Sequence, residues 1–152
     1  MTKLTKRAVL AAGIVGSAAM MLPLTALAED PATKAPADVY CYIIWPNDHE
    51  VLRSGSIWVR FGLRGMGIAP AGVEMENTGH HHLYIDVDEP MTPAGEYIPA
   101  DKKHLHFGGG LTETHLDLPP GVHTLQLVLS DGKHRAFDPP IFSKKITVRV
   151  LR

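Results

Sequence analysis

The sequence has one cysteine, no basic stripe and none of the common catalytic motifs, and each absence excludes a class of protein. Cys41 has no partner for an internal disulfide, and its apolar surroundings predict a buried, inert thiol. Without clustered Lys and Arg, nucleic acid is excluded as a partner. There is no Gly-x-Ser-x-Gly or His-Glu-x-x-His string, and no Lys-Ser/Thr follows the glycine run at 108–110. These absences favour binding over catalysis.

The first 28 residues have the pattern of a secretory signal peptide. Three basic residues precede an apolar stretch at 8–22, and Ala26-Leu27-Ala28 fits the small-x-small rule for cleavage. An uncleaved anchor is the alternative, because residues 8–28 are long enough to cross a bilayer. No cysteine near the cleavage point offers a lipid anchor. We therefore expect cleavage after Ala28, a periplasmic or secreted protein, and no stable membrane anchor afterwards.

The remaining chain predicts a short leader and one domain. Residues 29–38 are rich in Pro and Ala and have no periodicity, which indicates a flexible leader, and residues 39–152 form the domain. Removal of Lys3, Lys6 and Arg7 leaves 12 basic against 16 acidic residues, a net charge of −4 with histidine neutral.

The domain has no stretch of helical periodicity and reads as short strands between turn signals. The sequence predicts an all-β fold, an immunoglobulin-like antiparallel β-sandwich of about seven strands. Asp138-Pro139-Pro140 is interpreted as a break between strands, and the long loop at 64–78 as a candidate functional loop. The predicted strands are residues 39–44, 56–63, 81–87, 104–107, 112–118, 122–130 and 145–151.

Histidine is the abundant residue: the chain has nine, and five of them lie between positions 80 and 106. Because side chains alternate along a strand, His80 and His82 share one face, while His81 faces the core with the apolar residues at 83, 85 and 87. His104 and His106 repeat the spacing. Two such pairs on neighbouring strands can supply four imidazole nitrogens, enough for a zinc or a copper(II) site. Surface histidines without a ligand are the alternative.

Other residues form a second tier of candidate ligands. His81 can be a core histidine bonded to a carbonyl or a ligand, His123 ends a core-facing row, and His134 lies in a turn. Met66, in the long loop, adds a thioether, and thioether with imidazole favours copper over zinc.

Several strings resemble a small exported bacterial family known as domain of unknown function 4399, over residues 39–150. Two departures are Leu111, where the family usually has Gln, and His115, where it has a small or hydroxyl residue. The resemblance implies an exported β domain whose His strings and glycine-rich loop form one signature, and implies no function. The strings are Gly65-Met66-Gly67-Ile68-Ala69-Pro70-Ala71-Gly72, Asn77-Thr78-Gly79-His80-His81-His82-Leu83, His104-Leu105-His106-Phe107-Gly108-Gly109-Gly110, Leu116-Asp117-Leu118-Pro119-Pro120-Gly121 and His123-Thr124-Leu125-Gln126-Leu127.

We therefore hypothesise an exported metal-binding protein, with copper before zinc, that sequesters or delivers the ion through His80, His82, His104 and His106. Another periplasmic protein is a candidate partner. The first alternative is a non-catalytic module for protein or glycan binding in which the histidines are structural. The second is a metal-dependent enzyme, which needs an open coordination position and a base beside it.

Overall fold

The computed structural model describes residues 30–88 and 91–152, and the regular structure of these residues is entirely β. The predicted signal peptide lies outside them. No helix long and apolar enough to cross a membrane is found in the described part of the chain. Its ten strands are β1 (Tyr40–Trp45), β2 (Glu50–Leu52), β3 (Ser56–Arg64), β4 (Gly67–Ile68), β5 (Thr78–Ile85), β6 (His104–His106), β7 (Glu113–Asp117), β8 (Gly121–Ser130), β9 (Ala136–Phe142) and β10 (Ile146–Val150).

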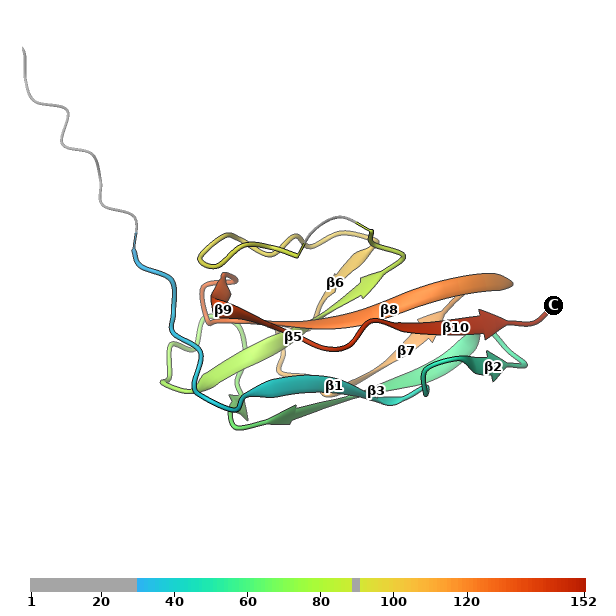
Figure 1. The fold of residues 1–152 in the computed structure, drawn as a ribbon, viewed down its shortest axis with the longest axis horizontal. Helices are drawn as coiled ribbons and strands as arrows, with labels where there is room; N and C mark the ends of the chain where they lie inside the picture. The colour runs from blue at the N-terminus through green and yellow to red at the C-terminus, as the bar shows by residue number, and fades with distance from the viewer. Residues whose placement is uncertain (1–29, 89–90) are drawn as a thin grey trace, which may run out of the picture.

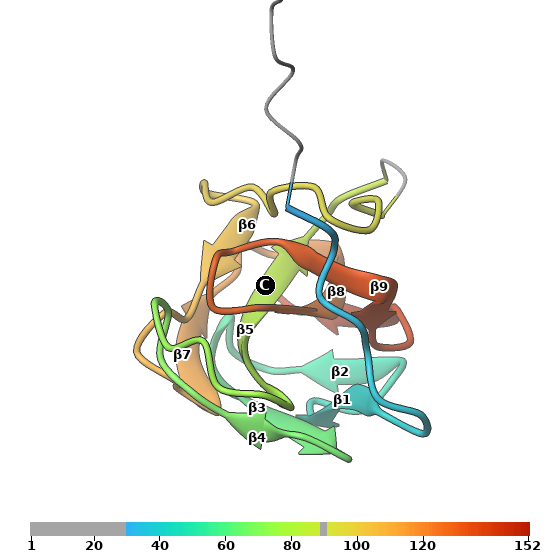
Figure 2. The ribbon, with the colours of Figure 1, turned by 90° about the vertical axis from the view of Figure 1, so that its left-hand side faces the viewer.

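The strands form two sheets that face each other (Figures 1 and 2). The smaller sheet is antiparallel, in the order β1-β3-β7. The larger runs β2-β10-β8-β5-β4, with β6 paired to β5 and β9 paired to β8. β5 and β8 are thus its central strands, and each carries two short strands along its outer edge.

The space between the sheets holds the main hydrophobic core. Cys41, Val59 and Phe61 enter it from the smaller sheet, and Leu83 and Leu127 from the larger. Burying a side chain of the size of leucine contributes roughly 1.5–3 kcal/mol, so this core supports the fold without a metal ion. Burial raises the pKa of the Cys41 thiol to about 12, which confirms the predicted inert cysteine.

A second small cluster covers the opposite face of the larger sheet. It joins Tyr84 and Val128 of the central strands to Ile98 of the segment that precedes β6, with Val87 and Ala136. In Figure 1 this segment lies over β5 and β8 as a partial third layer. Side chains that point away from the main core are therefore buried as well.

The all-β expectation is confirmed, and a strand occurs at each of the seven predicted places. The short β2 and β4 were not predicted, and neither was β9, because Asp138-Pro139-Pro140 was interpreted as a break. Proline is tolerated at an irregularity in a strand, where no ladder partner needs its missing N–H. The two prolines lie between Ala136 and Ile141, in the irregular part of the pairing of β9 with β8. The arrangement is also not wholly antiparallel, since β2 and β4 pair in parallel with β10 and β5. The immunoglobulin-like topology stays a prediction.

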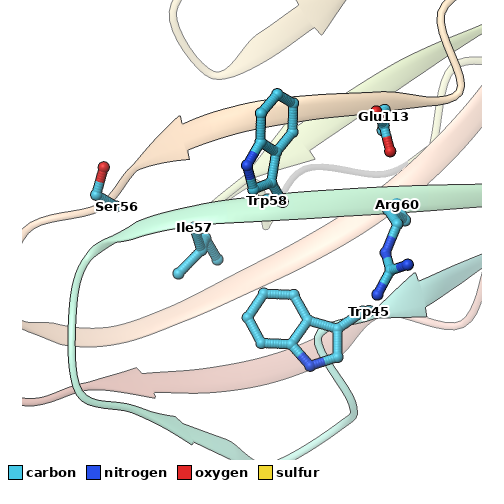
Figure 3. Close-up of a pocket in the computed structure, with 6 residues that line it drawn as sticks. All are labelled: Trp45, Ser56, Ile57, Trp58, Arg60 and Glu113. Atoms are coloured by element: carbon cyan, nitrogen blue, oxygen red, sulfur yellow. The ribbon is translucent and has the colours of Figure 1, made fainter.

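The outer face of the smaller sheet carries exposed aromatic side chains. Trp58 of β3 is more than half exposed and packs edge-on against His115 of β7. Trp58, Arg60 and Glu113 line a shallow depression together with Trp45 at the end of β1 (Figure 3). The residues of this depression belong to the sheet opposite β5, so the depression is separate from the histidine-rich region.

His81 faces the main core, as its position in the alternation predicts. Its ring meets the edge of Phe61, with the ring centroids 5.3 Å apart, and neither ring nitrogen has a hydrogen-bond partner. Burial lowers its pKa to about 4, so the imidazole is neutral at neutral pH.

We predict that His81→Leu raises the free energy of unfolding by about 1–2 kcal/mol. A buried polar group without a partner costs roughly 1–3 kcal/mol, and leucine has no such group. Urea denaturation at pH 7.5 measures the change. A loss of stability in the variant would contradict this account, because it would mean that the imidazole has a favourable partner in the core.

Candidate metal centre

The pairing of β5 with its neighbours places His80 and His82 on the face away from the main core. His80 lies opposite Ser130 of β8, and His82 lies between Val128 of β8 and His106 of β6. Both side chains are fully buried. β5 begins at Thr78, so the whole His run lies inside the strand and the predicted shared face is confirmed.

His106 reaches the same face from β6, and a glycine makes its position possible. Its ring centroid lies 4.9 Å from that of His82 and 5.0 Å from that of His80. A Cβ at Gly108 would lie 2.4 Å from Cε1 of His106, so a larger residue there would displace the ring. The glycine run after β6 therefore leaves room for an imidazole.

His134 completes the group from the turn between β8 and β9. Its backbone has a φ of 63°, a left-handed conformation that aims the side chain back over the sheet. Its ring centroid lies 4.9 Å from that of His80 and 4.5 Å from that of His106. The central strand β5, the short strand β6 and the turn between β8 and β9 thus bring four imidazoles together.

The four histidines, His80, His82, His106 and His134, each offer one ring nitrogen, and these atoms lie within 4.8 Å of one another. Nε2 of His80 and Nε2 of His106 are 3.2 Å apart. Nitrogens that bind one zinc-like ion at 2.0–2.1 Å in a tetrahedron are about 3.3 Å apart, so that pair needs almost no movement. The group, which we call the histidine cluster, could hold a metal ion.

Unpaired nitrogens in the cluster fit this interpretation. His80 Nε2 lies 2.8 Å from Ser130 Oγ, but its Nδ1 and both ring nitrogens of His82 are buried without a hydrogen-bond partner. Buried polar atoms are nearly always paired. A metal ion binds one nitrogen of each imidazole, so an ion in the cluster would give a partner to one of the two buried nitrogens of His82.

The electrostatics favour the neutral form of three of the cluster histidines. Burial, reinforced by the neighbouring imidazoles, lowers the pKa of His80 to about 4 and that of His82 to about 3. Burial and His134 also lower the pKa of His106. Neutral imidazole is the form that binds metals, so these rings need not lose a proton before binding at neutral pH.

His104 lies outside the cluster, although it was predicted to be a ligand with His106. It is opposite Tyr84, two pairs further along the β5–β6 ladder, and its ring packs edge-on against Tyr84 at 4.5 Å between centroids. Its Nδ1 lies 2.9 Å from the Asp101 carboxylate. His104 and His106 do share a face, but the His104 ring is held against Tyr84 and Asp101 and does not reach the other histidines.

Of the second-tier candidate ligands, one lies in the cluster and three lie outside it. His134 joins the cluster, whereas His81 points to the opposite face of the sheet. His123 is a satisfied structural histidine, as its place in the core-facing row suggested, because its nitrogens lie 2.8 Å from the Asp86 carboxylate and the Pro119 carbonyl. Met66 packs against the main core.

His134 is distant in sequence from the other cluster histidines. It is 52 positions from His82, and it approaches the others only because β8 pairs antiparallel with β5 and then turns back at Asp131. The one available signal is that a strand of alternating apolar residues ends directly before a histidine-bearing turn.

A sequence profile for a domain of unknown function, DUF4399, matches residues 59–151. The chain therefore belongs to this family, as the resemblance indicated, and the match covers β3 to β10 with all four cluster histidines. No curated protein and no solved structure matches the chain. The function must therefore be argued from the site itself.

We predict that the His123–Asp86 pair stabilises the protein only within a pH window. Both neighbours of the His123 ring are acceptors, so the ring bonds both only when it is protonated. Partial burial lowers its pKa, but the bonds to Asp86 and Pro119 outweigh burial and the pKa is raised. Burial likewise opposes, but does not prevent, a lowered pKa at Asp86.

The pH dependence of this stabilisation follows from the directions of the two pKa shifts. A raised histidine pKa stabilises the fold below about 6.5, and this contribution is lost as pH rises through the folded-state value. A lowered aspartate pKa stabilises it above about 3.9, and this contribution is lost at lower pH. The coupling free energy between His123→Gln and Asp86→Asn, from urea denaturation, should therefore be larger at pH 5.5 than at pH 8.5. Equal couplings at the two pH values would contradict a charged pair.

Proposed function

We propose that this is an exported protein that binds one divalent transition-metal ion, copper(II) or zinc, in the histidine cluster and sequesters or delivers it. The observation that carries the proposal is the convergence of four imidazoles, two of which, those of His80 and His82, are fully buried and have ring nitrogens without a hydrogen-bond partner. Imidazole nitrogen suits zinc, copper and nickel, and the set contains no carboxylate, which would favour magnesium or calcium.

The cluster consists of a buried pair and an outer pair of histidines. His80 and His82 are fully buried on a central strand, whereas His106 is exposed and His134 partly exposed. The buried pair supplies a rigid base, and the outer pair leaves a route by which an ion can enter and leave. Because the main core is complete without the site, the ion is better explained as cargo than as a structural staple.

The expectation that the cluster prefers copper to zinc rests on the general order of metal affinities. The thioether argument weakens because Met66 packs against the main core. For any fixed set of nitrogen ligands, copper(II) binds more tightly than zinc or nickel. We therefore expect copper(II) to displace zinc from the cluster.

We predict that the untagged protein binds about one equivalent of copper(II) or zinc, and that His134→Ala weakens binding at least about tenfold because it removes one of four nitrogens. His104→Ala is the matched control, since it removes a nearby histidine from outside the cluster. Isothermal titration measures both affinities. A larger loss in His104→Ala than in His134→Ala would contradict the assignment, and no binding by the unchanged protein would favour the interaction-module alternative.

We predict that the metal-induced rise in Tm persists at pH 5.5 and disappears near pH 4. Protons and metal compete for the same nitrogens, and exposed imidazoles would lose the metal near about pH 6.5. Since burial lowers the pKa of His80 to about 4 and that of His82 to about 3, protons displace the metal only at lower pH. Melting curves with and without metal at pH 7.5, 5.5 and 4 test this. Complete loss of the rise between pH 7 and 6 would point to ordinary surface histidines.

A further inference from the structure

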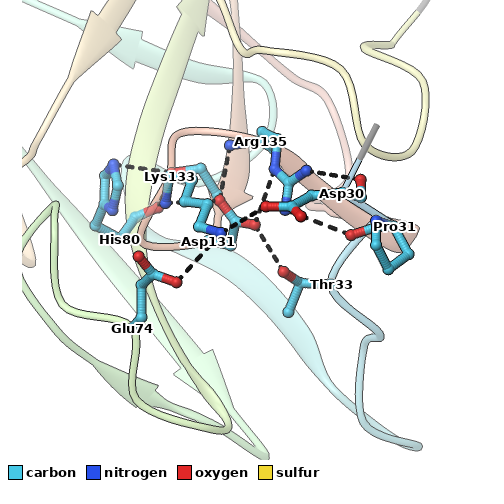
Figure 4. Close-up of polar contacts among 9 residues, drawn as sticks. Asp30, Pro31, Thr33, Glu74, His80, Asp131, Lys133 and Arg135 are labelled. Carbon is cyan, nitrogen blue, oxygen red and sulfur yellow. Dashed lines mark hydrogen bonds and ion pairs between the residues drawn. The ribbon is translucent and has the colours of Figure 1, made fainter. Parts of the chain in front are cut away.

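Residues 30–35, which we call the N-terminal strap, lie along the turn that carries His134 (Figure 4). The backbone N–H of Asp138 donates to the Thr33 carbonyl at 2.8 Å, and that of Ala35 donates to the Asp138 carbonyl at 2.9 Å. These bonds seat the strap beside the start of β9. The segment expected to be a flexible leader thus makes backbone contacts only a few residues from a cluster histidine.

The turn is organised by one buried carboxylate, that of Asp131. Its Oδ1 accepts the backbone N–H groups of Lys133 and Arg135, each at 2.9 Å. The N–H of His134 donates to the Asp131 carbonyl at 3.1 Å. His134 therefore lies inside a loop whose shape depends on Asp131.

The strap supplies the remaining partner of that carboxylate. Thr33 Oγ1 donates to Asp131 Oδ2 at 2.7 Å, and Arg135 Nε lies 3.6 Å from the same oxygen. The Arg135 guanidinium also donates to the carbonyls of Asp30 and Pro31, at 3.0 and 3.4 Å. The contacts form a continuous chain from the strap through Asp131 and Arg135 to the backbone of His134.

We propose that docking of the N-terminal strap holds His134 in its ligating position, so that metal affinity depends on residues that do not touch the metal. This inference rests on the proposed function. Strap and metal are then linked: detaching the strap weakens metal binding, and metal binding holds the strap down by the same factor. Thr33 is a positioning residue, and the strap positions His134, one of the two outer histidines of the cluster.

The test replaces the hydroxyl of Thr33 in the full chain. Thr33→Val keeps the shape but leaves a buried carboxylate oxygen without its donor, and we expect zinc affinity to fall about three- to tenfold. Thr33→Ser should restore it. Lys34→Gln is the control in the strap, because Lys34 is exposed and pairs with Asp138 away from the turn. Isothermal titration with zinc gives the affinities.

Hydrogen exchange supplies an independent readout. Zinc should slow exchange of the Ala35 amide in the unchanged protein, and the factor should be smaller in Thr33→Val. The Leu151 amide, bonded to Leu52 at the far end of the molecule (Figure 1), should not respond. If the unchanged protein binds no zinc, the proposed function fails. If the unchanged protein binds zinc, and Thr33→Val binds it equally well with the same slowing of exchange at the Ala35 amide, only the proposed role of the strap is overturned.

Discussion

The register between β5 and β8 is the constraint on which the rest of the structure depends. It pairs Leu83 with Leu127 towards the main core and His80 with Ser130, so that alternate side chains serve the core and the cluster. A slip by one residue would exchange the two faces, turning Leu83 away from the main core and burying His80 and His82 in its apolar surroundings. The core-facing apolar side chains of both strands thus fix the position of the histidines on the other face of the sheet.

Hydrogen bonding decides which form of a buried histidine this fold favours. At His123 two acceptors meet the ring and favour its charged form, which makes it a structural group. At His80 and His82 the surroundings supply too few partners, and desolvation keeps the rings neutral. Leaving buried nitrogens unpaired costs stability. At His81 this cost stands alone in the main core, whereas at His80 and His82 it coincides with two further imidazoles, where an ion could bind.

The long loop before β5 makes backbone hydrogen bonds close to both outer histidines of the cluster, His106 and His134. The N–H of Ala71 donates to the Gly108 carbonyl beside His106, and the N–H of Gly72 donates to the Gly132 carbonyl beside His134, each at 2.8 Å. A Cβ at Gly132 would lie 2.3 Å from the Val73 carbonyl oxygen, so the loop and the turn are in close contact. Together with the strap, this loop explains how ligands outside the central strands are held.

The sequence by itself determined the elements whose physics is local. Strand periodicity predicted seven of the ten strands of the described residues, including the two that carry His80, His82 and His106, and placed His80 and His82 on one face, because side-chain alternation needs only the chain itself. It could not find β2, β4 or β9, whose residues become strands only beside a partner. Only the tertiary structure decided between His104 and His134. That choice depends on where the β5–β6 ladder and the β8–β9 turn converge in space, and convergence between segments some 50 residues apart is set by pairing and core packing rather than by local pattern.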